Sequence, residues 1–421
     1  MNLILAIPLV VRLAALFVCG VGLGAVVNRA VYGLATMPRC CHPWLRRRPE
    51  APPRAAWYGI PIVGWLGMRQ ESVLHGRFFW LRPMVVELAW GLALPALYWW
   101  ETVALGLLPI DVPPRIPAAD LPVWLAVMHM QFLAHAVLLT FMLAGSLIDI
   151  DEKIIPDPIT LPATLLGLVF AAVFPWSLLP EVFSVNQLPA LRFLTVVSPK
   201  QWHLEGLSGL TWLIAGLLCW AMWCFAILPR TWYARHGWRR ALVLCMARVA
   251  RQPSTMWVSV LAILGAGAIV GLWWQGGARW AAVLSALVGM AVASGLIWLV
   301  RFIGRAALGR EAMGFGDVLL MAMIGAYVGW QPSLFIFFLA PVAGLVIGVL
   351  TLYLSSDREI PYGPFLCLAA VAVIVWWAPI WEWGFKLFDM GWFVPAIMLG
   401  CMAIMFVLLA IWRLVLTALG R

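Results

Sequence analysis

Apolar residues in this chain gather into long uninterrupted runs, separated by shorter polar stretches. A helix of about 20 apolar residues crosses the hydrocarbon core of a bilayer. The pattern predicts eleven membrane-spanning helices, near residues 3–28, 84–108, 121–148, 159–180, 208–228, 254–275, 279–302, 316–330, 332–355, 364–382 and 391–417. The eighth run is short, which favours a tilted or partly re-entrant helix. The expected fold class is all-α, a polytopic membrane helical bundle.

Composition supports this class. Of the 421 residues, 64% are hydrophobic and 11% are charged, and the mean hydropathy is +0.96. A soluble globular protein is about 45–50% apolar and about 25% charged. The first apolar run is expected to be a membrane span rather than a cleaved signal, because Arg12 interrupts the run instead of preceding it.

Arginines gather in alternate loops, which orients the predicted spans. They are dense between residues 37 and 82 and between residues 230 and 251, and Arg301, Arg305 and Arg310 precede the eighth run. The positive-inside rule places such loops in the cytoplasm. We therefore predict an outside N-terminus and a cytoplasmic C-terminus. The net charge of +10 then indicates anionic membrane lipids as partners, and no nucleic acid is expected.

The same pattern divides the chain into five predicted segments. They are a first membrane span, an Arg-rich cytoplasmic loop, a membrane core, an outward-facing loop with a helical hairpin, and a second membrane core. Their bounds are 1–36, 37–83, 84–180, 181–278 and 279–421. Within the fourth segment, the amphiphilic stretch 181–206 is long enough for an interfacial helix or a lid.

Two acidic motifs lie where apolar runs meet polar residues, and they carry the candidate chemistry. Asp149 directly follows one apolar run, and Asp317 begins another after Gly314-Phe315-Gly316. Acids in membrane segments are costly and by default suggest function. The predicted orientation puts both aspartates at the cytoplasmic face. Two close carboxyl groups share a proton, which is the arrangement that activates water in aspartic proteolysis.

Structural explanations compete for the other acids and for the glycines. Asp157 with Pro158 has the pattern of an N-cap followed by proline at the first helical position, and Asp151 and Glu152 are expected to face headgroups. Glu87 and Glu101 could equally be packing partners for arginine. His129 and His135 are expected to bond within the core rather than to bind metal. Gly314 and Gly316 are expected to let the backbone approach a substrate strand closely or to adopt a positive φ beside the acid.

The cysteines give little support for a metal centre. Cys40, Cys41, His42 and the distant His75 could bind a metal, but the chain has no Cys-x-x-Cys pair, and adjacent cysteines rarely both reach one tetrahedral ion. We predict no zinc site and no other cofactor.

The second motif, with Glu311 before it and Val318 after it, resembles the GxGD signature of intramembrane aspartyl proteases. Combined with Asp149 and the later Pro156-Asp157, it resembles the bacterial type IV prepilin peptidase family. Further stretches in the family's order agree with this resemblance: 24–28 with Tyr32, 60–61, 82–88 and 360–366.

The resemblance implies a catalytic pair, Asp149 and Asp317, supported by Gly314, Gly316, Pro156, Asp157 and Glu311. It implies an inner-membrane endopeptidase that removes the basic leader of prepilins or pseudopilins after a glycine, at the cytoplasmic face. Three features depart from the family pattern. The polar loop lacks the two Cys-x-x-Cys pairs, so we do not expect methylation with S-adenosylmethionine. The two aspartates are unusually far apart in sequence, which predicts that the hairpin within 181–278 is an insertion. Leu319 stands where lysine is common.

Two other functions remain open at this point. A non-catalytic relative could bind pilin-like helices as an assembly factor, and it would tolerate Asp149→Asn or Asp317→Asn. An ion-coupled transporter could use intramembrane acids to carry protons, but few acids lie deep in the predicted spans and no inverted repeat is visible.

Overall fold

The structure is a computed structural model that describes residues 6–35, 41–46, 49–185, 188–199, 204–228, 252–308, 313–354, 361–391 and 393–418. Seven helices in these ranges are long and apolar enough to cross a membrane. They are α2 (Leu9–Gly33), α6 (Leu121–Glu152), α8 (Leu210–Ile227), α10 (Pro253–Gln275), α11 (Gly277–Leu308), α13 (Trp330–Leu354) and α16 (Phe393–Ala418). The prediction of a helical multi-pass membrane protein is confirmed, and the predicted orientation stays a prediction.

The remaining predicted spans are helical, but they differ from single long helices. α5 (Leu81–Tyr98) continues into the π-helical turn η3 (Trp99–Val103), and α7 (Asp157–Val173) and α12 (Phe315–Val328) are short. The predicted tenth span, 364–382, consists of α14 (Gly363–Val375) and α15 (Trp377–Asp389), which meet at 90°. Pro379 lacks the N–H that would bond one turn back, which favours a break before it. The count of eleven straight spans is therefore not confirmed.

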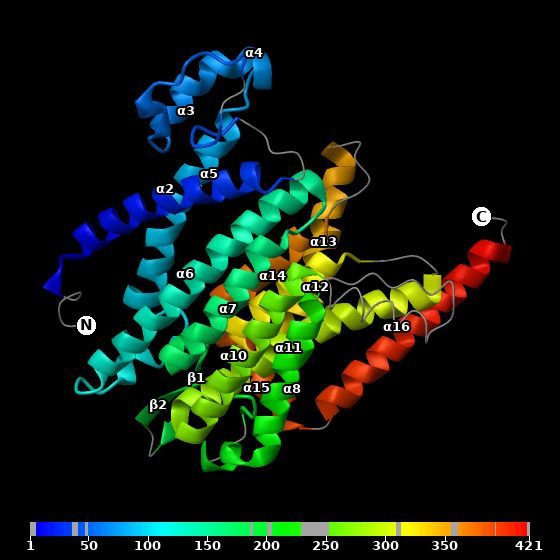
Figure 1. Cartoon of the computed structure of the whole chain (residues 1–421). Helices are drawn as coiled ribbons and strands as arrows, with labels where there is room; N and C mark the ends of the chain where they lie inside the picture. Colours follow the sequence, from blue (N-terminus) through cyan, green and yellow to red (C-terminus); the bar gives the residue numbers. More distant parts are fainter. Residues whose placement is uncertain are drawn as a thin grey trace.

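The Arg-rich loop folds into short pieces, as its prolines predict, and forms one end of the molecule (Figure 1). These pieces are η1 (Ala56–Gly59), α3 (Val63–Gly67), η2 (Met68–Glu71) and α4 (Ser72–His75). Arg54 holds them together by donating to both oxygens of the buried Glu71, at 2.6 and 2.8 Å.

A β-hairpin lies at the other end of the bundle (Figure 1). Strands β1 (Pro180–Val185) and β2 (Leu188–Phe193) pair antiparallel, with Pro180 opposite Phe193. The short helices η4 (Pro113–Arg115), η5 (Pro175–Ser177) and η6 (Leu204–Ser208) complete the described elements. An interfacial helix is therefore the wrong prediction for the start of the amphiphilic stretch. Glu181 and Arg192 pair across the strands at 2.7 Å, which favours the hairpin.

The core is centred on α12, whose residues from Asp317 to Val328 are all buried. Gly289 of α11 and Gly325 of α12 bring the two helix backbones together, since a Cβ on either one would collide with the carbonyl oxygen of the other. Close approach at small residues is the usual packing of membrane helices. The packing fixes α12, and with it the position of Asp317 in its first turn.

Candidate active site

Asp149 lies in the last turn of α6, where the chain leaves the helix. Lys153 ends this helix in a left-handed conformation, with φ of 57°, and its N–H donates to the carbonyl of Asp149 at 2.8 Å. The Asp149 side chain is buried, and its Oδ2 accepts a hydrogen bond from the N–H of Gly363 at 3.0 Å. Gly363 is the first residue of α14, so the carboxylate faces the positive end of a helix dipole.

Asp317 lies in the first turn of α12 and is also buried. Gly314 is the N-cap of this helix, and a Cβ on it would lie 3.5 Å from Oδ2 of Asp317. The charge of Asp149 acts on Asp317, so the two carboxyl groups are within electrostatic range of each other. Both aspartates that the sequence singled out are thus buried at helix ends, and their pairing stays a prediction.

Ile155 packs between the elements that carry the two aspartates. A Cβ on Gly363 would lie 2.5 Å from Oδ2 of Asp149 and 2.9 Å from Cδ1 of Ile155. A Cβ on Gly316 would lie 3.0 Å from Cβ of Ile155. Both glycines therefore allow α12 and α14 to pack closely against the turn that follows Asp149.

The supporting residues differ from their predicted roles. Gly314 has φ of −69°, and Gly316 lies inside a helix, so the predicted positive φ is wrong for both. Gly316 packs closely on Ile155, and the predicted close approach to a substrate stays a prediction. α7 begins one residue earlier than predicted, with Pro156 as the N-cap and Asp157 inside the first turn. Glu311 lies outside the described residues.

Sequence reasoning missed several residues of the site. It assigned no role to Gly363, Tyr362 or Cys367, although the late stretch 360–366 pointed to this region. The charge of Asp317 acts on Tyr362, and the charges of both aspartates act on the buried Cys367. A backbone donor such as the Gly363 N–H has no side-chain signal in a sequence.

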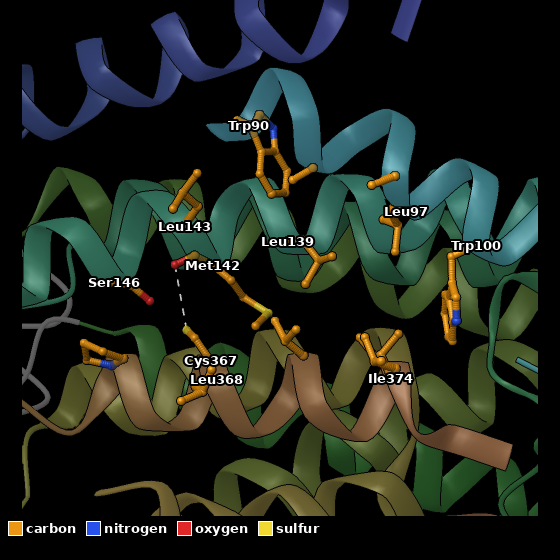
Figure 2. A pocket seen from close by; sticks show the side chains of 15 residues that line it. Trp90, Leu97, Trp100, Leu139, Met142, Leu143, Ser146, Cys367, Leu368 and Ile374 are labelled. Carbon is orange, nitrogen blue, oxygen red and sulfur yellow. Dashed lines mark hydrogen bonds between the residues drawn. The ribbon is translucent and has the colours of Figure 1, made fainter. Parts of the chain in front are cut away.

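An apolar groove of about 540 Å³ runs along α5, α6 and α14, and one end lies near the last turn of α6 (Figure 2). Ser146 and Pro364 lie at this end, three residues before Asp149 and one residue after Gly363. Figure 2 shows the lining side chains facing one another from the three helices, among them Trp90, Leu97, Trp100, Leu139, Met142, Leu143, Leu368 and Ile374.

Another buried carboxylate, Glu87, ties the polar loop to the helices. It accepts hydrogen bonds from the Asn28 side chain at 3.1 Å, from the Trp65 indole at 2.8 Å and from the Ile62 N–H at 2.5 Å. Gly24 packs directly on its backbone. An arginine partner is therefore the wrong prediction for Glu87, whose partners come from α2 and from the polar loop.

The two buried histidines of α6 bond to neighbouring helical segments, as predicted. His135 pairs with Glu101 at 2.7 Å, which also replaces the suggested arginine partner of Glu101. His129 bonds the Tyr98 hydroxyl at 3.0 Å. Asp151, expected among headgroups, pairs with Arg82 at 2.6 Å and is mostly shielded.

The histidines considered as zinc ligands make separate contacts in the structure. Cys40 lies outside the described residues, and His75 pairs with Glu71 at 3.3 Å. His42 is buried beside Trp44 and Trp65, and burial lowers its pKa to about 4. Among the described residues, no group of three or more His, Cys, Asp or Glu side chains could hold a metal ion.

Part of the chain is similar to a known protein family. Residues 252–349 match the type IV leader peptidase family. This part of the chain is therefore similar to the type IV leader peptidases. The match includes Gly314, Gly316 and Asp317, whereas Asp149 precedes it. It also includes α10, which lies within the segment predicted to hold the insertion.

Individual relatives carry the name prepilin leader peptidase/N-methyltransferase. The protein from Burkholderia pseudomallei is 29% identical over 145 residues, which cover 34% of this chain and 46% of the relative. The Stutzerimonas stutzeri protein is 35% identical over 99 residues, or 23% of this chain and 34% of that protein. The Pseudomonas aeruginosa protein is 36% identical over 83 residues, or 19% and 29%. The chain thus spans less than half the length of these relatives. No solved structure matches the chain.

Proposed function

We propose that this protein is a membrane-embedded aspartic endopeptidase. Its substrates are prepilins or pseudopilins, from which it removes the short basic leader at the cytoplasmic face of the bacterial inner membrane. One observation carries the proposal: two buried aspartates, distant in sequence, lie at helix ends whose glycines, Gly363 and Gly316, both pack on Ile155. The match to the leader peptidase family and the names of the relatives support the choice of substrate.

In the proposed mechanism, water attacks the scissile carbonyl between the two carboxyl groups. Two acids in one low-dielectric site hold one proton between them. Asp149 receives the Gly363 N–H at the N-terminus of α14, which stabilises its anion, so Asp149 takes the proton from water. Asp317 starts protonated and donates its proton to the carbonyl oxygen as water adds. When the diol collapses, Asp149 passes the proton that it took from water to the departing amine, and the diol returns a proton to Asp317. The dyad requires no covalent nucleophile, metal or S-adenosylmethionine, and we propose none.

The groove of Figure 2 is the proposed site for the apolar helix that follows the leader. Its lining is almost entirely apolar, and one end adjoins the Asp149–Gly363 hydrogen bond. A substrate helix in this groove presents the bond at its cytoplasmic end to the aspartates. Proximity of this kind contributes much of the rate in enzymes.

Leader removal by the intact protein tests the catalytic pair. Co-expression with a pilin substrate should give a shortened product on a gel, whereas Asp149→Asn and Asp317→Asn should each leave the precursor intact. Asp111→Asn is the matched control, since Asp111 is exposed and pairs with Arg115 away from the site. Processing that survives both active-site changes would instead support a non-catalytic, pilin-binding relative.

A second pair of variants tests the groove. Leu368→Trp enlarges a side chain that lines it, and Leu264→Trp makes the same change on an exposed position of α10. We expect cleavage to slow several-fold in Leu368→Trp only. Equal cleavage in the two variants at equal expression would place the substrate helix elsewhere.

A further inference from the structure

A second cavity lies between α8, α11 and α12. It has a volume of about 270 Å³, and its walls include Met222 and Trp223 of α8, Gly295 and Trp298 of α11, and Phe315 of α12. It shares no lining residue with the groove beside α14. The proposed mechanism therefore leaves this cavity unused.

The apolar cavity opens into a basic mouth of about 520 Å³. Trp298 and Phe315 line both spaces, and Arg301 and Arg305 line the mouth one helical turn apart on α11. Trp298 and Phe302 are about half exposed and stack at 5.8 Å. Tryptophan and arginine together at a helix end are typical of the level of lipid headgroups.

An apolar interior with a cationic mouth matches the two parts of a phospholipid. A free phosphate would use the arginines but would leave the apolar part unfilled. A neutral lipid would fill the apolar part but would gain nothing from two guanidinium groups, which bind phosphate oxygens well. The combined shape therefore favours an anionic phospholipid over either ligand.

We propose that this cavity binds an anionic phospholipid, with an acyl chain between α8 and α11 and its phosphate between Arg301 and Arg305. The site is built partly from α8, which belongs to the segment predicted to be inserted. It therefore gives that segment a role that does not depend on the peptidase proposal.

The position of Arg301 connects the lipid site to the acidic motif. Its guanidinium lies 5.5 Å from the centroid of the Phe315 ring, and its charge acts on Asp317. A phosphate that draws on Arg301 changes the field at Asp317 and holds the first turn of α12. Lipid composition is therefore expected to modulate whatever chemistry Asp317 performs.

Native mass spectrometry of the full-length protein in detergent tests binding without reference to cleavage. With added phosphatidylglycerol, the wild-type protein should retain lipid that phosphatidylcholine and inorganic phosphate do not displace. Gly295→Leu should abolish this retention, because its side chain would enter the cavity from a position with nothing within 4 Å of the added Cβ. Gly271→Leu on α10 has the same open surroundings away from the cavity and should retain lipid like the wild type.

Charge variants test the mouth separately. Arg305→Ala should weaken phosphatidylglycerol retention about fivefold, the usual contribution of one arginine near an anionic headgroup, and Arg305→Lys should restore part of it. Arg115→Ala removes one positive charge elsewhere and should have no effect. Equal lipid retention in Gly295→Leu and Gly271→Leu would overturn the proposal, as would displacement of the lipid by inorganic phosphate. Size-exclusion profiles matching the wild type ensure that any loss is not caused by unfolding.

Discussion

Two groups of buried acids lie at the same end of this molecule, and their surroundings differ. Glu87 accepts hydrogen bonds from a side-chain amide, an indole and a backbone N–H, so its carboxylate is well satisfied. Asp149 instead accepts one backbone hydrogen bond, from Gly363, and its charge acts on Asp317. A satisfied buried acid holds structure together, whereas two acids that oppose each other are kept at an energetic cost. We therefore predict that Glu87 contributes to stability, whereas Asp149 and Asp317 carry out the chemistry.

Replacing Asp317 by asparagine should give the largest effect on activity. We expect leader cleavage to fall by about 10²–10⁴-fold, the usual contribution of a positioned acid or base. Thermal stability should stay the same or rise, because the change removes the repulsion between the two carboxyl groups. Cleavage kinetics and a thermal melt on the same preparation measure both quantities. A variant that loses stability and activity together would show that Asp317, like Glu87, is needed for stability.

Gly363→Ala should come next, because it disturbs the site without removing either acid. Its new Cβ would press on Oδ2 of Asp149 and on Ile155. A displacement of about 1 Å at a reacting group can cost about 10²-fold in rate. Gly400→Ala on α16 has open space around the added Cβ and serves as the control. Unchanged cleavage in Gly363→Ala would mean that the Asp149–Gly363 contact is not needed for chemistry.

Glu87→Ala should act on stability rather than on the reacting groups. It leaves the buried Trp65 indole N–H and the Ile62 N–H without their acceptor, whereas Asn28 keeps the Pro83 carbonyl. An unsatisfied buried donor costs about 1–3 kcal/mol. Limited proteolysis should show earlier cleavage of the polar loop, while the remaining folded protein still removes leaders. Asn28→Ala should give a smaller loss, because Glu87 keeps two of its partners. If Glu87→Ala abolished cleavage at full stability, the division of roles would fail.

Helices and acids were predictable from the sequence because both produce local signals. Long apolar runs mark spans, and an aspartate after such a run is conspicuous, as at Asp149. Pro379 also indicated the bend between α14 and α15, but it lies within an apolar run long enough to suggest a single span. The partners of Glu87 and the donor from Gly363 depend on tertiary packing across distant segments, and no local pattern encodes them. The hairpin likewise depends on long-range contacts, including the Trp377 indole that donates to the Pro180 carbonyl at 2.7 Å.

The smallest expected effect concerns His42 in the polar loop, where burial lowers the pKa from 6.5 to about 4. Between these values the unfolded loop binds more protons than the folded loop, so its stability falls as the pH drops from about 6.5 towards 4. We expect a loss of about 1–3 kcal/mol over this range, since the side chain is only 1% exposed. Proteolysis of the loop at pH 7 and pH 5 measures it. His42→Asn should remove most of the difference between the two pH values, whereas His129→Asn, far from the loop, should leave it in place. An equal pH response in wild type and His42→Asn would show that another group causes the pH dependence. Glu87 would then be the next group to test.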